Sequence, residues 1–341
     1  MPVRISDLGT AYKTRYDQLR HAVFTGDARS VEELLPTRAD ILKDFGEGLL
    51  RKACMEGYPD VVRVLLAHGA KPPTGGNQRP DNLLKTVIWS IRGNSSDAER
   101  DSCIKILHLL IEYGVNPNMM DGDSQVPLHY SCDLEEKDTD AALELTRILL
   151  DAGADVNARN HHNETPLLKV TNNGNVPVAE LLIDRGADVN AKDEEDCAPL
   201  SDASRGGHTD LARLLLDHGA EVDARDKYGY TSLHWVCEEG HTDLARLLLE
   251  TGADVNIKNG IGSTPLHRAC SEGHTDIASL LIEKGADPGA RNKVGTTPLD
   301  LVLNNLTPDN PAREEILDLF RQYAPEMVME AYCMQSPGGV R

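Results

Sequence analysis

The sequence of 341 residues predicts an all-α fold in which short helix pairs stack on one another. The first observation is a short phrase, Thr-Pro-Leu or a close variant, that returns every 33 residues. Its proline slot is filled in turn by Pro166, Pro199, Ser232, Pro265 and Pro298. The second is that each interval carries two short apolar patterns of helical spacing. The third is an aromatic content of only 4%, which suits thin helical layers filled by aliphatic side chains. Such a period indicates stacked units, none of which buries its apolar face alone.

The period over residues 263–295 shows how one unit is expected to fold. Thr264 and Pro265 fit a helix start, because a threonine hydroxyl caps helices and the fixed φ of proline suits the first helical position. Apolar residues at helical spacing then give each of two helices one buried face. We expect Gly285 to end the second helix in the left-handed conformation. Residues 286–294 carry turn-forming residues without helical spacing, so they predict a hairpin-like loop.

This phrase resembles the ankyrin repeat. The family pattern of Thr-Pro-Leu-His, Gly-His, Leu-Leu-Leu and Gly-Ala-Asp-Val-Asn is met nearly in full by the units that begin near Thr231 and Thr264. Two other units drift: Ala198 replaces the threonine in one, and Leu168 replaces the histidine in another. The resemblance covers nearly the whole chain. It implies an ankyrin-repeat solenoid of about nine helix-turn-helix units with hairpin-like loops.

The same register predicts how the chain is divided. Successive parts are an N-terminal segment with a diverged capping repeat (1–46), ankyrin repeats (47–295), a C-terminal capping repeat (296–324) and a tail (325–341). Two neighbouring repeats are lengthened, by extra chain near residues 92–102 and 133–140. Both insertions fall between the two helices of their repeats. We therefore expect them to lie side by side.

Charge and hydropathy limit the classes of partner. Lys and Arg total 35 against 55 Asp and Glu, a formal net charge of −20, which disfavours direct binding of nucleic acid. The sequence has no apolar run long enough for a membrane span and no signal-peptide core, so we expect a cytoplasmic or nuclear protein. We also expect a monomer that binds another protein and uses no cofactor or metal.

The cysteines are interpreted as packing residues. Cys54, Cys132, Cys237 and Cys270 occupy one slot of the repeat, a small core position on the first helix. Cys237 and Cys270 would lie on neighbouring helices about 8 to 10 Å apart, beyond the roughly 7 Å reach of a disulfide. We therefore predict buried free thiols.

The histidines also recur at fixed slots. One set follows the leucine of the phrase (His129, His234, His267), and another follows a glycine (His208, His241, His274). Fixed recurrence indicates hydrogen bonding to backbone in caps and loops, not general base catalysis. No glycine-rich segment completes a nucleotide-binding loop. The sequence therefore predicts that the protein is not an enzyme.

Binding residues are sought where repeats differ while their framework stays constant. By resemblance to the family, these are the concave face, the hairpin tips and the pair before the helix-ending glycine. The candidate surface is Tyr130, Lys169, Lys227, Tyr228, Tyr230, Trp235, Glu238, Glu239, Ile261, Arg268, Ser271, Glu272 and Lys293. Tyr, Trp and Arg are enriched at interface hot spots, which favours residues 227–268 as the centre. Trp235 has a second interpretation, in which it closes a gap between helical layers.

These observations predict a non-catalytic scaffold or adaptor that binds a partner protein through its concave face and hairpin tips. One alternative is a regulatory inhibitor that occludes an enzyme or transcription factor. Another is that the insertion lobe covers a small-molecule or catalytic site, although no nucleophile, base and orienting group can be assembled there from the sequence. The fold alone does not fix the partner.

Overall fold

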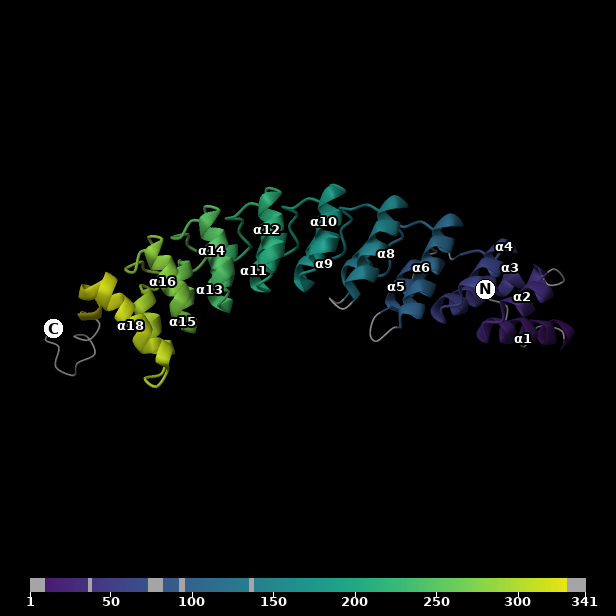
Figure 1. Ribbon diagram of the computed structural model, residues 1–341, viewed down its shortest axis with the longest axis horizontal. Coiled ribbons are helices and arrows are strands. Elements are labelled where there is room, and N and C mark those ends of the chain that lie inside the picture. Colours follow the sequence, from purple (N-terminus) through teal and green to yellow (C-terminus); the bar gives the residue numbers. More distant parts are fainter. Residues whose placement is uncertain (1–9, 36–38, 73–81, 92–95, 135–137, 330–341) are drawn as a thin grey trace. The chain divides into compact units, whose positions relative to one another are not determined.

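The computed structural model describes residues 10–35, 39–72, 82–91, 96–134 and 138–329. Within these ranges the chain forms helices and no strand, so the all-α prediction is confirmed. The helices follow one another as nine successive pairs, from α1/α2 to α17/α18 (Figure 1). Contacts between Cα atoms divide the chain into two units, and the division falls in the pair α9 (Pro166–Asn173) and α10 (Val176–Asp184).

The N-terminal unit contains four helix pairs. Their bounds are α1 Thr10–Phe24, α2 Ala28–Leu34, α3 Ala39–Met55, α4 Pro59–Ala67, α5 Leu83–Trp89, α6 Asp97–Glu112, α7 Pro127–Cys132 and α8 Thr139–Asp151. The first helices of the pairs contact one another in chain order, and so do the second helices. Fully buried leucines such as Leu19, Leu50 and Leu84 fill the layers between them. Each pair thus buries its apolar face against its neighbours.

Helix α3 runs across the predicted boundary between residues 46 and 47. It begins at Ala39, so that boundary falls inside a helix. The cause is an added apolar turn: Ile41 and Leu42 are buried, and the ring of Phe45 lies 4.5 Å from that of Tyr16 on α1.

The two insertions lengthen helices and do not simply add loop. Helices α6 and α8 have 16 and 13 residues, whereas the second helices α12, α14 and α16 have 9. Ser96 caps α6 in a capping box with Glu99. Arg100 of α6 places its NH2 atom 2.7 Å from Oδ1 of Asp138, directly before α8. This ion pair confirms that the described parts of the two insertions lie side by side; residues 92–95 and 135–137 fall outside the described residues.

The C-terminal unit repeats the predicted period. Its further helices are α11 Pro199–Arg205, α12 Thr209–Asp217, α13 Ser232–Glu239, α14 Thr242–Glu250, α15 Pro265–Glu272, α16 Thr275–Glu283, α17 Pro298–Asn305 and α18 Pro311–Tyr323. First helices contact first helices, and second contact second, in chain order from α11 to α18. Gly285 ends α16 with φ 91°, the left-handed conformation expected of it. Beyond α18, Val328 is also buried, and residues 330–341 of the predicted tail lie outside the description.

The predicted cysteine packing is confirmed. Cys54, Cys132, Cys237 and Cys270 are free thiols, each at most 2% exposed. Burial raises the pKa of Cys132 to about 12, so its thiol stays protonated. These side chains act as small apolar residues between the layers.

Candidate functional site

Five side chains of the C-terminal unit form a group that we call the arginine-aromatic cluster: Arg205, Tyr230, Trp235, Glu238 and Arg268. Trp235 and Glu238 are three residues apart on α13, so they share one face of that helix. The hairpin before α13 contributes the tyrosine, α15 contributes Arg268, and Arg205 ends α11. The repeat period thus brings side chains from three successive units together.

The cluster is a stack of rings and cations. The Tyr230 and Trp235 ring centroids are 4.9 Å apart, with an interplanar angle of 32°. The guanidinium carbon of Arg205 lies 4.7 Å from the Trp235 ring, and that of Arg268 lies 5.0 Å from the Tyr230 ring. Both distances are within the roughly 6 Å range of cation–π attraction. The two rings are therefore held by a cation on either side.

Three polar atoms of the cluster have no hydrogen-bond partner among the described residues, although solvent barely reaches them. They are Trp235 Nε1, Glu238 Oε2 and Arg268 Nε. The last two are 3.7 Å apart, close enough for an ion pair but too far for a hydrogen bond. Burial raises the pKa of Glu238 despite the nearby arginine. Polar atoms shielded from water are normally hydrogen-bonded, so these three atoms mark a cluster whose polar groups are incompletely satisfied among the described residues.

Trp235 matches both interpretations of its role. It is half-buried, so part of its indole packs within the unit and part reaches the surface.

Arg205 was missed by sequence reasoning. It precedes the glycine that follows α11, and the rule that selected the pairs before Gly240 and Gly273 also applies to it.

Four of the predicted hairpin-tip residues are exposed, whereas Tyr230 is half-buried. Tyr228 and Ile261 are 60% and 56% exposed, and Lys227 and Lys293 are exposed beside them. The backbone N–H of Gly260 donates to the carbonyl of Tyr228 at 2.7 Å, and that of Lys293 donates to the carbonyl of Ile261 at 3.0 Å. Successive tips are therefore joined edge to edge.

The remaining candidates of the C-terminal unit end their first helices. Glu239 and Glu272 are exposed, and each precedes a left-handed glycine. Ser271 is half-buried, and its hydroxyl accepts a hydrogen bond from Asn305 Nδ2 at 2.7 Å. All three lie on the same helix ends as the arginine-aromatic cluster.

Tyr130, a candidate in the N-terminal unit, lies beneath the surface with only 4% of its area exposed. Its hydroxyl donates to Asp121, and burial raises its pKa to about 12. Lys85 Nζ lies 2.6 Å from Asp121 Oδ2 and 4.7 Å from the tyrosine ring. Trp89 is 49% exposed, and its ring centroid lies 6.0 Å from that of Tyr130 in an edge-on contact. We call Lys85, Trp89, Asp121 and Tyr130 the closed cluster, of which Trp89 is the exposed aromatic residue.

Lys169, the other candidate of the N-terminal unit, is half-buried. Its ammonium lies 2.5 Å from Oε2 of Glu164. That carboxylate also accepts a hydrogen bond from Asn160, so the lysine is anchored to the hairpin before its own helix.

Five of the six recurring histidines, His129, His234, His241, His267 and His274, bond to backbone carbonyls, as predicted. His234 Nδ1 accepts a hydrogen bond from the N–H of Thr231 at 3.2 Å, and Nε2 donates to the carbonyl of Ser263 at 3.0 Å. Burial lowers the pKa of His234 to about 4. The neutral ring therefore fastens one repeat to the next hairpin, and its geometry is that of a structural group.

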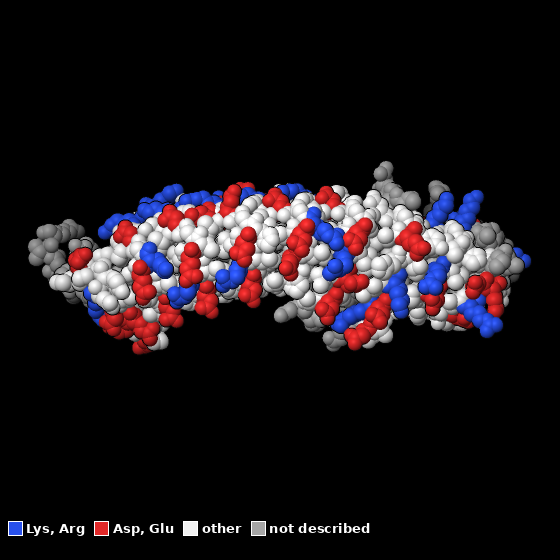
Figure 2. Space-filling view, turned by 45° about the horizontal axis from the view of Figure 1, so that its top comes forward, with Lys and Arg blue, Asp and Glu red and all other residues white. Residues whose placement is uncertain are grey.

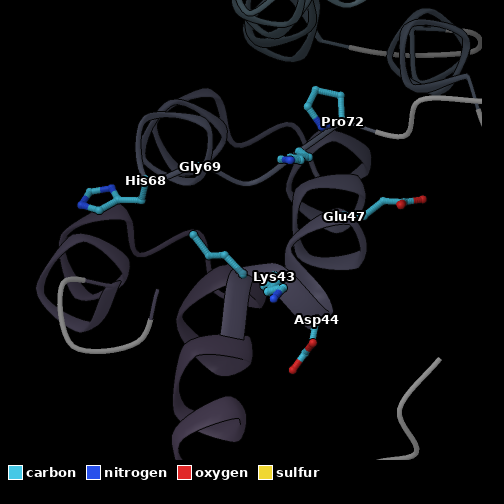
Figure 3. Close-up of a pocket in the computed structure, with 8 residues that line it drawn as sticks. Lys43, Asp44, Glu47, His68, Gly69 and Pro72 are labelled. Carbon is cyan, nitrogen blue, oxygen red and sulfur yellow. The ribbon is translucent and has the colours of Figure 1, made fainter. Parts of the chain in front are cut away.

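Two cavities in the N-terminal unit show no catalytic arrangement. A cavity of about 430 Å³ lies between α3 and the end of α4, and its Glu47 and His68 side chains point in opposite directions (Figure 3). A second, of about 240 Å³, lies at the insertions and is lined by acidic residues of α6 and α8 with Arg100. No group of three or more His, Cys, Asp or Glu in the described ranges is placed to hold a metal. Nor does any helix in those ranges have the length and apolar character to cross a membrane.

Helix pairs of fixed period that display variable residues on open faces define a repeat protein of the interaction class. Two family profiles match the chain. One, for ankyrin repeats in many copies, matches residues 200–242 and 233–282, and the other, for ankyrin repeats in three copies, matches residues 95–193. The matches together cover more than half of the sequence. The chain belongs to the ankyrin repeat family, whose repeats generally mediate protein–protein interaction and are typically non-catalytic.

A relative from Fowlpox virus (strain NVSL) is named an ankyrin repeat protein. It is 32% identical over 142 residues, which are 41% of this chain and 28% of that protein. The chain thus spans under a third of the length of this relative.

Proposed function

We propose that this protein is a non-catalytic binding module that holds a partner protein against the C-terminal unit, with the arginine-aromatic cluster at the centre of the contact. Membership of a family of interaction modules supports this role. The partner binds as a separate chain, and the module itself acts as a monomer. The buried free thiols fit a reducing compartment, the cytosol or nucleus.

The observation that carries the proposal is the unsatisfied state of the cluster. An indole donor, a guanidinium donor and a carboxylate acceptor lie within one patch, shielded from water and with no hydrogen bond to any residue that the structure describes. The Arg268 and Glu238 side chains are themselves 20% and 32% exposed, so on rotating outward they would take an acceptor and a donor from a partner and complete the patch. Such polar matching gains free energy because the free protein has already excluded most of the water. Trp and Arg are also the side chains that most often dominate interface energetics.

The test measures partner binding and stability in the same variants. The partner is first isolated on the intact chain and identified, and its purified form is then titrated. Trp235→Ala and Arg268→Ala should each weaken binding by about tenfold or more, as expected for central interface residues. The melting temperature should fall little for Arg268→Ala, whose side chain makes only an ion pair and a ring contact.

The matched controls are Arg213→Ala and Arg246→Ala. Both arginines are exposed on second helices of the same unit, α12 and α14. They should leave the affinity unchanged. If the control variants weaken binding as much as Arg268→Ala does, or if Arg268→Ala binds as tightly as the unmodified chain, the cluster is not the centre of the contact.

A further inference from the structure

Three large apolar side chains are exposed at the same place in successive repeats. Tyr228, Ile261 and Val294 are 33 residues apart and lie at the tips of consecutive hairpins. They are 60%, 56% and 84% exposed. Exposed apolar residues scattered singly need no explanation, but a series in one register is a surface feature. We call these three residues the tip stripe.

The tips are packed closely enough to make the stripe continuous. The two backbone hydrogen bonds described above join the three tips in sequence. A Cβ atom on Gly260 would come within 2.5 Å of the carbonyl oxygen of Tyr228, and one on Gly262 within 2.9 Å of the backbone nitrogen of Lys293. Glycine at these positions allows the tips to meet. The stripe is thus presented on a backbone whose tips are held in fixed register.

The charge around the stripe is opposite in sign to that of the protein. The three tips, residues 224–230, 257–263 and 290–296, contain the basic residues Arg225, Lys227, Lys258, Arg291 and Lys293 and one acidic residue, Asp226. Their formal charge is therefore +4, in a chain whose net charge is −20. The preceding tip, residues 191–197, contains one Lys and four acidic residues. Figure 2 shows Lys and Arg gathered along the upper edge of the C-terminal unit.

In the part of the chain that the structure describes, four of these five basic side chains form no ion pair with a carboxylate. Arg225 donates to the carbonyl of Lys258 at 2.7 Å, Lys258 to that of Arg291 at 3.1 Å, and Lys293 to that of Gly260 at 2.6 Å. These acceptors are uncharged. Lys227 is the exception among the five, since it pairs with Glu195. The tips therefore combine an apolar row with a positive field.

We propose that the tip stripe binds a linear acidic segment of a partner protein in the polyproline II conformation, with apolar side chains at every third residue. The proposal rests on the protein-binding function above and names the chemistry of the bound segment. Helix packing sets the step between repeats at about 8 to 10 Å. A polyproline II helix has three residues per turn and rises about 3.1 Å per residue, so positions i, i+3 and i+6 share one face about 9 Å apart.

Other occupants fit less well. A β-strand places every second side chain on one face, about 7 Å apart, so its row falls out of step with the tips. A single-stranded nucleic acid would need a series of stacking side chains, and only one of the three stripe residues is aromatic. Acidic residues between the apolar ones of a peptide would meet Arg225, Lys258, Arg291 and Lys293 along the row.

The experiment uses the full chain and labelled synthetic peptides of about ten residues. The matched peptide carries Leu at positions i, i+3 and i+6, with Asp, Glu and Pro between them. The permuted peptide has the same composition with Leu at i, i+2 and i+4. Fluorescence anisotropy should show the matched peptide binding about tenfold more tightly than the permuted one. Raising the salt from about 0.05 M to about 0.5 M should weaken binding several-fold, because exposed charges are then screened.

Two variants and a control locate the site. Ile261→Ser with Val294→Ser should abolish the preference for the matched peptide, and Lys258→Ala with Lys293→Ala should remove about half of the salt dependence, because Arg225 and Arg291 remain. Met55→Ser, an exposed apolar residue of the N-terminal unit, should change neither. Circular dichroism checks that each variant keeps its helix content.

Equal binding of the two peptides, or tighter binding of a single-stranded oligonucleotide, would overturn the inference. The proposed function is tested separately, by Trp235→Ala and Arg268→Ala with the isolated partner. If those variants weaken the partner while the matched peptide fails to bind, the function stands and the tip stripe is not the site. If the peptide binds as described and those variants have no effect, the tip stripe stands and the cluster is not the centre.

Discussion

Asp121 in the N-terminal unit and Asp226 in the C-terminal unit hold the same place in their repeats, nine residues before Tyr130 and Trp235. Oδ1 of each carboxylate caps a hairpin turn by accepting two backbone N–H groups. The difference is in the second oxygen. Oδ2 of Asp121 binds both Lys85 and the hydroxyl of Tyr130, whereas the hydrogen bonds of Asp226 in the described structure fall on Oδ1.

The consequence is that the same repeat framework carries a closed cluster around Asp121 and an open cluster, which is the arginine-aromatic cluster, around Trp235. In the N-terminal unit a nearly buried carboxylate completes the polar groups around it, so removing it should cost stability. In the C-terminal unit an indole replaces the phenol, and polar atoms of Trp235, Glu238 and Arg268 have no hydrogen-bond partner among the described residues. The repeat position of Tyr130 and Trp235 therefore stabilises the fold in the N-terminal unit, and in the C-terminal unit we assign it to partner binding.

Asp121→Ala should have the largest effect on the free energy of unfolding, a loss of roughly 3 to 5 kcal/mol, because it leaves a lysine ammonium and a buried phenol without their acceptor. Asp226→Ala, which removes a turn cap only, should cost about 1 to 2 kcal/mol. Urea unfolding of both variants measures the difference.

The asparagine variants serve as matched controls for these two substitutions. Asn259 and Asn292 cap the equivalent turns of later repeats with the same bonds, so Asp226→Asn should be nearly neutral. Asp121→Asn should still be costly, since Lys85 loses its charged partner. Equal losses for the two asparagine variants would contradict the division into a closed and an open cluster.

Stability should also fall in acid, through the histidines that fasten repeats in both units. Burial lowers the pKa values of His129, His234 and His267 in the folded protein. Between the folded and unfolded pKa values the unfolded chain binds more protons, so unfolding becomes easier as pH falls. The stabilisation is complete above the unfolded pKa of 6.5 and is lost progressively toward pH 4, the value for His234.

For His234 alone the loss amounts to roughly 3 kcal/mol, at about 1.4 kcal/mol per pKa unit. Urea midpoints at pH 7.5, 5.5 and 4.5 report the sum for all three histidines. The ring signals of His234 in a proton NMR titration should stay constant down to about pH 5. A titration near the ordinary histidine pKa would show that the ring is not held neutral.

Among the alanine substitutions, the smallest expected effect on stability is that of Arg268→Ala, a loss of about 0.5 to 1 kcal/mol. Its guanidinium makes one long ion pair and one ring contact, and its removal also leaves Glu238 free to hydrate. Thermal unfolding beside Asp121→Ala gives the comparison directly. A loss as large as that of Asp121→Ala would mean that the open cluster is a structural element after all.

Much of the fold could be predicted because its signals are local. Threonine and proline at helix starts, glycine at helix ends and cysteine or histidine at fixed slots recur with the period, and each acts within a few residues of its own position. The early start of α6 could also have been predicted from the sequence, because Ser96 and Glu99, three residues apart, form a capping-box pattern. The sequence interpretation placed extra chain there without assigning it to helix.

The candidate site was harder to predict because it depends on contacts between repeats. Tyr130 and Trp235 share a slot, yet one is almost wholly buried and the other half-buried. The preceding repeat contributes Lys85 and Trp89 to the contacts of Tyr130, whereas it contributes Arg205 to those of Trp235. A pattern read along the chain identifies the slot but not its neighbours across the layer.

The helix pairs, their caps, the buried thiols and the histidines could be predicted from the sequence, because each recurs at a fixed place in the period. Only the tertiary structure decided which variable side chains are exposed and which polar atoms are bonded. The tip stripe and the arginine-aromatic cluster arise where residues of successive repeats, 30 to 38 positions apart, come into contact. Their exposure and pairing depend on the packing of neighbouring units, which no single repeat contains.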